Sequence, residues 1–124
     1  MSCHQMVCHL SDAFRRAVGD RPPAERRDNL VTRTVVKWIA LRTSLPWPRG
    51  VRTPRDIDQV AGAGTPPTEF ERDRSALIGL IERFVGLPTG AQRPRHFVFG
   101  VLTMRDWQRW AWAHVDHHLR QFGV

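Results

Sequence analysis

The 124-residue sequence lacks a long apolar run. A membrane-spanning helix needs about 18 consecutive apolar residues, and no segment approaches that length. The N-terminus also lacks the basic segment and apolar stretch of a signal peptide. Hydrophobic residues make up 41% of the chain and charged residues 25%, which is ordinary for a soluble globular protein. We therefore expect a soluble, cytoplasmic protein with a single domain over residues 1–124.

Cysteine and lysine are both scarce. The two cysteines, Cys3 and Cys8, are five positions apart on one expected helix, and cysteines on an apolar helical face are mostly packing residues. Of the 19 basic residues only Lys37 is a lysine, and the net charge is +7. The arginines are scattered and accompany no recognisable nucleic-acid module, so a solvated basic surface is favoured over nucleic-acid binding.

Several catalytic and cofactor motifs are absent. No glycine-rich loop stands between a strand and a helix, so nucleotide binding is unsupported. The sequence ends in a His-x-x-x-His pattern without the glutamate of zincin proteases. Its only acid, Asp116, follows His114 by two residues and points to the opposite side of a helix. A zincin protease is therefore not implied.

Apolar periodicity and capping residues predict four helices and no strand. Capping boxes are expected at Ser2 with Gln5, at Thr68 with Glu71, and at Thr103 with Asp106. The helices are expected at about residues 2–18, from about Asp28 to before Pro46, at 68–86, and from 103 to 123. Residues 45–67 contain five prolines and little periodicity, which predicts a long connection over the surface. The expected architecture is an all-α bundle with two long connections.

Two histidines near the C-terminus give the strongest functional lead. His114 and His118 are four residues apart and share a helical face with Trp107, so both imidazoles are expected to point inward. Buried imidazoles need hydrogen-bond partners or a metal. Taken alone, the pair is as compatible with structurally satisfied histidines as with metal binding.

His9 adds a third imidazole at the edge of the first helix's apolar face, and three histidines can form a metal site. Asp12 follows one turn later and could orient a ring N–H of His9, although a solvated helix acid is favoured at that position. His117 lies about 100° around the helix from His118 and is expected to flank the site rather than share the metal.

Two further residues are candidates for the surroundings of this site. His96 is interpreted either as a loop residue or as a residue near the mouth of the site. Trp47 stands between two prolines in the long connection. It is interpreted either as a core residue or as a cover over the pocket.

These residues belong to a pattern that resembles the DinB-like superfamily of metalloenzymes, and the branch called domain of unknown function 1569 is the most similar. The segments that carry the resemblance are residues 1–12, 46–50, 64–67, 99–100 and 114–123. The resemblance implies an up-down helical bundle that holds a divalent metal ion, often nickel or zinc. The histidines of the family pattern correspond to His9, His114 and His118.

The resemblance also implies a type of activity. Characterised relatives include transferases and isomerases that use low-molecular-weight thiols, so we expect a small-molecule substrate and a metal that activates a thiol or water in a transferase or hydrolase. The superfamily further implies a bacterial-type protein. The alternative is a non-catalytic helical interaction module whose histidines are structural.

The sequence departs from the family pattern at its start. Relatives carry another helix before the segment that here begins at Met1, so the chain is expected to be truncated at its N-terminus or to start at an internal methionine. Loss of that helix would leave an apolar strip of Cys3, Val7, Leu10 and Phe14 exposed or covered by a partner chain. A homodimer is therefore a further expectation.

Overall fold

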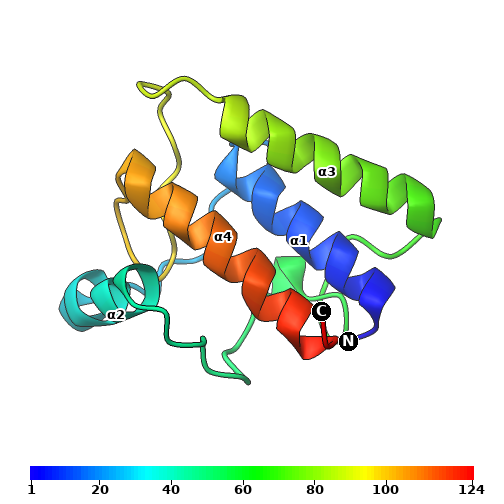
Figure 1. Ribbon diagram of the computed structural model, residues 1–124, viewed down its shortest axis with the longest axis horizontal. Coiled ribbons are helices and arrows are strands. Elements are labelled where there is room, and N and C mark those ends of the chain that lie inside the picture. The colour runs from blue at the N-terminus through cyan, green and yellow to red at the C-terminus, as the bar shows by residue number, and fades with distance from the viewer. The chain divides into compact units, whose positions relative to one another are not determined.

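The computed structural model describes residues 1–124 and contains helices but no strand (Figure 1). Its elements are α1 (Cys3–Ala17), the π-helical turn η1 (Thr32–Val36), α2 (Lys37–Arg42), the 3-10 turn η2 (Arg55–Ile57), α3 (Phe70–Gly86) and α4 (Met104–Gln121). The prediction of an all-α fold is confirmed. None of the helices combines the length and the apolar character required to cross a membrane.

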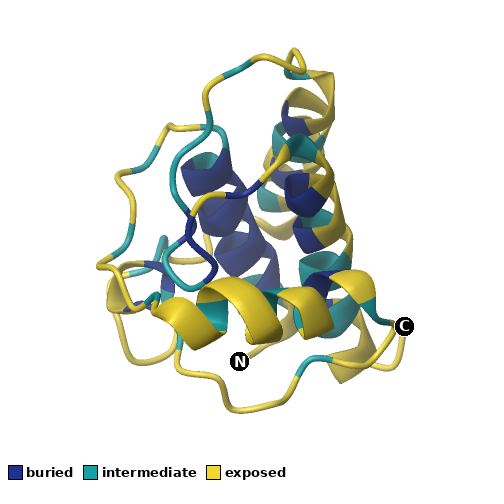
Figure 2. Cartoon of the chain, turned by 90° about the vertical axis from the view of Figure 1, so that its left-hand side faces the viewer, coloured by how far each residue is buried: buried dark blue, intermediate teal, exposed yellow.

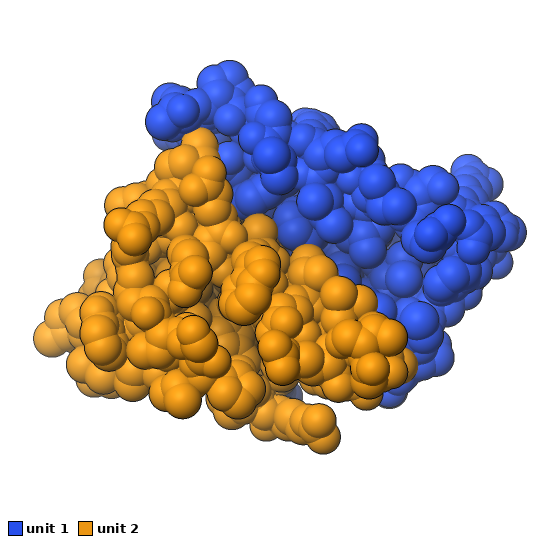
Figure 3. Space-filling model, in the orientation of Figure 1, with its two compact units in different colours: residues 1–23, 52–94 blue, residues 24–51, 95–124 orange.

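The chain folds into two compact units, and each unit combines two separate stretches of sequence (Figure 3). Unit 1 consists of Met1–Pro23 and Arg52–Pro94, and therefore contains α1, η2 and α3. Unit 2 consists of Ala24–Val51 and Arg95–Val124, and therefore contains η1, α2 and α4. Each unit accordingly pairs an early helix with a later one.

Reciprocal capping fixes the starts of α1 and α4. The Ser2 hydroxyl accepts from the backbone N–H of Gln5, whose side chain accepts from the backbone N–H of Ser2. Thr103 and Asp106 form the same arrangement at α4. Each arrangement pairs two backbone donors that a helix start would otherwise leave unpaired. Both of these predicted capping boxes are confirmed.

The capping box predicted for α3 at Thr68 is wrong. The N-cap is Glu69, whose carboxylate accepts from the backbone N–H groups of Glu71 and Arg72 at 3.0 and 2.8 Å. A carboxylate accepts more strongly than a hydroxyl and also interacts favourably with the positive end of the helix dipole. Thr68 instead donates from its backbone and its hydroxyl to the carboxylate of Asp73.

The second predicted helix is present and includes η1 and α2. Asn29 and Thr32 exchange hydrogen bonds between side chain and backbone where the helical segment begins. The segment ends at Thr43, where the backbone becomes extended before Pro46. The sequence therefore predicted its position, although the π-helical geometry of η1 was not anticipated.

In unit 1, α1 and α3 lie side by side (Figure 1). Most residues of α1 are buried, and it is the helix drawn mainly in dark blue in Figure 2. The ring of Phe14 meets the ring of Phe84 edge to face with centroids 5.4 Å apart, and both side chains are at most 2% exposed. Val7 and Leu10 are also buried, whereas Cys3 is exposed. The expectation of an exposed apolar strip on α1 is therefore wrong, because its apolar residues are already covered.

In unit 2, polar groups hold α2 against α4. The guanidinium of Arg42 donates to the carboxylate of Asp106 at 2.7 Å, and Arg109 donates to the carbonyl of Leu41 at 2.9 Å. The side chain of Leu41 is fully buried. These contacts fix the segment that leads into Trp47, whose indole N–H donates to the carbonyl of Ala40 at 3.0 Å.

Replacing Phe14 with alanine should lower the free energy of unfolding by about 3–5 kcal/mol, because it removes a buried ring and leaves a cavity against Phe84. Chemical denaturation monitored by circular dichroism measures this loss. Val85→Ala is the matched control on α3, since Val85 is 75% exposed and should change stability by less than about 0.5 kcal/mol. Equal effects of the two substitutions would contradict the assigned core.

Candidate functional site

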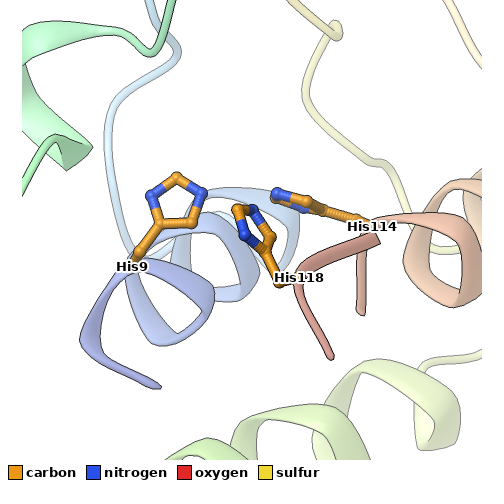
Figure 4. Close-up of side chains that lie close together, drawn as sticks. All are labelled: His9, His114 and His118. Atoms are coloured by element: carbon orange, nitrogen blue, oxygen red, sulfur yellow. The ribbon is translucent and has the colours of Figure 1, made fainter. Parts of the chain in front are cut away.

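His114 and His118 lie one turn apart on α4 (Figure 4). Their ring centroids are 5.0 Å apart, and the side chain of His118 is buried. Trp107 and Trp110 are the other large buried residues of this helix. The four-residue spacing therefore brings the two imidazoles together, as the periodicity predicts.

Gln121 determines the orientation of His118. Its amide oxygen lies 3.2 Å from Nδ1 of His118, and its amide nitrogen lies 3.0 Å from Nε2 of His117. With the Gln121 amide in this orientation its oxygen only accepts, so Nδ1 of His118 carries a proton and donates. The neutral ring then has its lone pair on Nε2. The amide nitrogen only donates, so the Nε2 atom of His117 accepts.

Tryptophans line His114 within unit 2. The indole of Trp47 stacks on the imidazole of His114 with centroids 6.0 Å apart and an interplanar angle of 27°. The ring of Trp110 packs against His114 with centroids 5.1 Å apart. Trp47 also lies 6.2 Å from the ring of His117. The long connection thus contributes an aromatic wall next to this histidine.

His9 projects from α1 in unit 1 and is 6% exposed (Figure 4). Its Nδ1 lies 2.8 Å from the carbonyl oxygen of Ile57, the last residue of η2. Since that oxygen only accepts, Nδ1 carries the proton and the lone pair of the neutral ring is on Nε2. Burial lowers the pKa of His9 below its ordinary value, which favours this neutral form.

Asp12 is completely buried, so the interpretation of Asp12 as a solvated helix acid is wrong. Its carboxylate accepts from the backbone N–H and hydroxyl of Thr65 at 2.8 and 2.7 Å, from Gln59 at 2.8 Å and from Arg15 at 2.9 Å. Arg21 lies 3.4 Å away and adds a second positive charge. These partners compensate the cost of burying the charge and anchor the loop after η2 to α1.

His96 is buried, and its Nδ1 accepts from the backbone N–H groups of Val98 and Phe99 at 3.2 and 3.1 Å. Its ring stacks on Phe99 and meets Trp107 and Trp110 edge-on. His96 therefore organises the loop before α4. A place for His96 near the mouth of a site stays a prediction.

Sequence reasoning missed two groups that orient the histidines. The acceptor for His9 is a backbone carbonyl of the long connection, which leaves no trace in residue identity. The acceptor for His118 is the side chain of Gln121, three residues later on the same helix. That i, i+3 spacing was a readable signal.

The fold and these side chains define an all-α protein with three histidines, His9, His114 and His118, that are candidate metal ligands. The chain belongs to the family described as Protein of unknown function (DUF1569), whose model matches residues 3–123. No curated protein and no solved structure matches the chain. The resemblance seen in the sequence is therefore confirmed at the level of this family.

Replacing Asp12 with asparagine should lower the free energy of unfolding by about 3 kcal/mol, since it removes the charge that compensates Arg15 and leaves buried donors poorly matched. Urea denaturation near neutral pH measures the change. Glu71→Gln is the control in the same unit, because Glu71 is 64% exposed in its ion pair with Arg74 and should cost less than about 1 kcal/mol. A loss no larger than that of the control would show that Asp12 does not anchor the loop.

Proposed function

We propose that the protein binds one divalent metal ion through the Nε2 atoms of His9, His114 and His118. The observation that carries the proposal is the state of two of these rings. In His9 and in His118, Nδ1 donates to an oxygen, Ile57 O in one case and Gln121 Oε1 in the other. Histidine ligands of metals typically donate their second ring nitrogen in this way, which fixes the tautomer and aims Nε2.

Three imidazole nitrogens suit a divalent cation of intermediate softness, such as zinc or nickel. Three neutral imidazoles bind zinc or nickel well and bind magnesium or calcium poorly. Because neutral imidazoles carry no negative charge, the metal centre would keep its net charge of +2. Three protein ligands also leave one coordination position open for a substrate or water. In catalytic sites, such an ion polarises bound groups and lowers the pKa of a bound water or thiol.

In this proposal the protein is a cytoplasmic member of the DinB-like superfamily and an enzyme acting on a small molecule. Transfer involving a low-molecular-weight thiol, or hydrolysis, is the reaction class that fits a three-histidine ion with an open position. Trp47 would provide an apolar wall next to His114 and help to exclude water from that side. Nickel and zinc are both suited to this ligand set.

Elemental analysis of the purified chain tests this proposal. We expect the His114→Ala, His118→Ala double variant to bind about one equivalent less zinc or nickel per chain than the wild type, because both ligands of α4 are lost. His117→Ala is the matched control, since it removes a neighbouring imidazole of the same helix and should retain the metal. Circular dichroism establishes that each variant is folded.

Equal metal content in the folded double variant and in the wild type would overturn the proposal. That result would favour a non-catalytic interaction module in which Gln121, Trp47 and Trp110 hold the histidines as packing residues. Metal loss in His117→Ala alone would instead move the ligand role to His117.

A further inference from the structure

We propose that unit 1 contains a second metal site, in which His4, Cys8 and Asp73 bind one zinc ion. The three residues offer an imidazole nitrogen, a sulfur and a carboxylate oxygen that all lie within 4.8 Å of one another. His4 and Cys8 are four residues apart on α1, so they share one helical face. Asp73 comes from the first turn of α3, which packs on α1.

The imidazole of His4 and the thiol of Cys8 both meet the same carboxylate oxygen of Asp73. His4 Nε2 lies 2.8 Å from Asp73 Oδ2, and the Cys8 thiol donates to the same oxygen at 3.7 Å. In a tetrahedral zinc site, sulfur and oxygen ligands are roughly 3.6 Å apart, and nitrogen and oxygen ligands roughly 3.4 Å apart. The sulfur therefore needs almost no movement, and the imidazole needs to withdraw by roughly 0.6 Å, which a small side-chain rotation supplies.

Neighbouring residues keep the carboxylate and the imidazole in place. Thr68 donates from its backbone N–H to Oδ2 of Asp73 at 2.9 Å and from its hydroxyl to Oδ1 at 3.1 Å. The ring of Phe70 meets the ring of His4 edge-on with centroids 5.4 Å apart. Such outer contacts orient the ligands of a metal site.

Exposure differs among the three residues in a way that suits an ion-binding site. The thiol of Cys8 is buried, whereas the side chains of His4 and Asp73 are 25% and 20% exposed. An ion can therefore reach the cluster from solvent, and a water molecule can complete its coordination.

The ligand chemistry selects the ion. A thiolate and an imidazole favour zinc over magnesium or calcium. Burial, followed by the nearby carboxylate of Asp73, raises the pKa of the Cys8 thiol to about 11, so the thiol is protonated in the absence of metal. Zinc would displace the thiol proton to solvent, and the ring proton of His4 would move from Nε2, which donates to Asp73, to Nδ1, so that the Nε2 lone pair binds the ion. The two positive charges of zinc would balance the thiolate and the carboxylate. The resulting neutral centre would link α1 to α3 and stabilise unit 1.

Cobalt provides a selective probe, because a bound thiolate gives Co²⁺ an intense sulfur-to-metal charge-transfer absorption that histidine ligands do not give. Titration of the reduced full chain with Co²⁺ should produce this absorption and saturate at one sulfur-ligated ion per chain. Zinc should then abolish the absorption by displacing cobalt. Zinc should also raise the unfolding midpoint of the chain.

Variants assign the ligands. Cys8→Ser should abolish the absorption, whereas Cys3→Ser, a matched change of the exposed cysteine on the same helix, should preserve it. Asp73→Asn should weaken cobalt affinity at least tenfold. The side chain of Asp73 is partly exposed, so this variant still tests the site if the Cys8→Ser variant fails to fold. The His114→Ala, His118→Ala double variant should retain the absorption, which separates this site from the three-histidine site.

No charge-transfer absorption in the folded wild-type chain would overturn the second site and would leave the three-histidine proposal untouched. An absorption that is lost in Cys3→Ser but retained in Cys8→Ser would also overturn it, because the sulfur ligand would then be Cys3. If the His114→Ala, His118→Ala double variant loses metal while Cys8→Ser and Asp73→Asn lose none, the second site is overturned and only the three-histidine site is supported.

Discussion

The buried carboxylate of Asp12 is the constraint on which the geometry of unit 1 depends. It has no exposure to solvent, so its charge has to be compensated by the groups around it. Two of those groups, Gln59 and Thr65, belong to the loop that follows η2. That loop contains Gly62, Gly64, Pro66 and Pro67, and it forms no helix or strand. The carboxylate therefore holds this loop to α1, next to Ile57, the last residue of η2, whose carbonyl orients His9.

The helices could be predicted from sequence because their signals are local. Apolar spacing and the reciprocal caps at Ser2 and Thr103 located α1 and α4 closely. At α3 the same reasoning chose Thr68, because a hydroxyl three residues before Glu71 has the form of a capping box. The structure uses the carboxylate of Glu69 instead, since Thr68 is engaged with Asp73. A competing partner five residues away is not visible to a rule that considers a fixed spacing.

The candidate site was only partly predictable for the same reason. His114 and His118 are paired by helical spacing, which a sequence displays directly. Two partners of Asp12, Gln59 and Thr65, lie 47 and 53 residues away, and the acceptor for His9 lies 48 residues away. Their proximity to α1 depends on how the long connection folds, so the spacing of residues could not reveal it. The burial of Asp12 was missed accordingly.

The two proposed sites differ in the charge of their ligands, and this difference assigns them different roles. At His9 and His118 the groups that accept from Nδ1 are uncharged, a peptide carbonyl and a carboxamide. Uncharged acceptors add less electron density to the imidazole than a carboxylate would, so an ion bound there would keep a high capacity to polarise a substrate. The cluster of His4, Cys8 and Asp73 supplies two anionic ligands and would neutralise its ion. The first arrangement favours chemistry at an open coordination position, and the second favours a stable link between two helices.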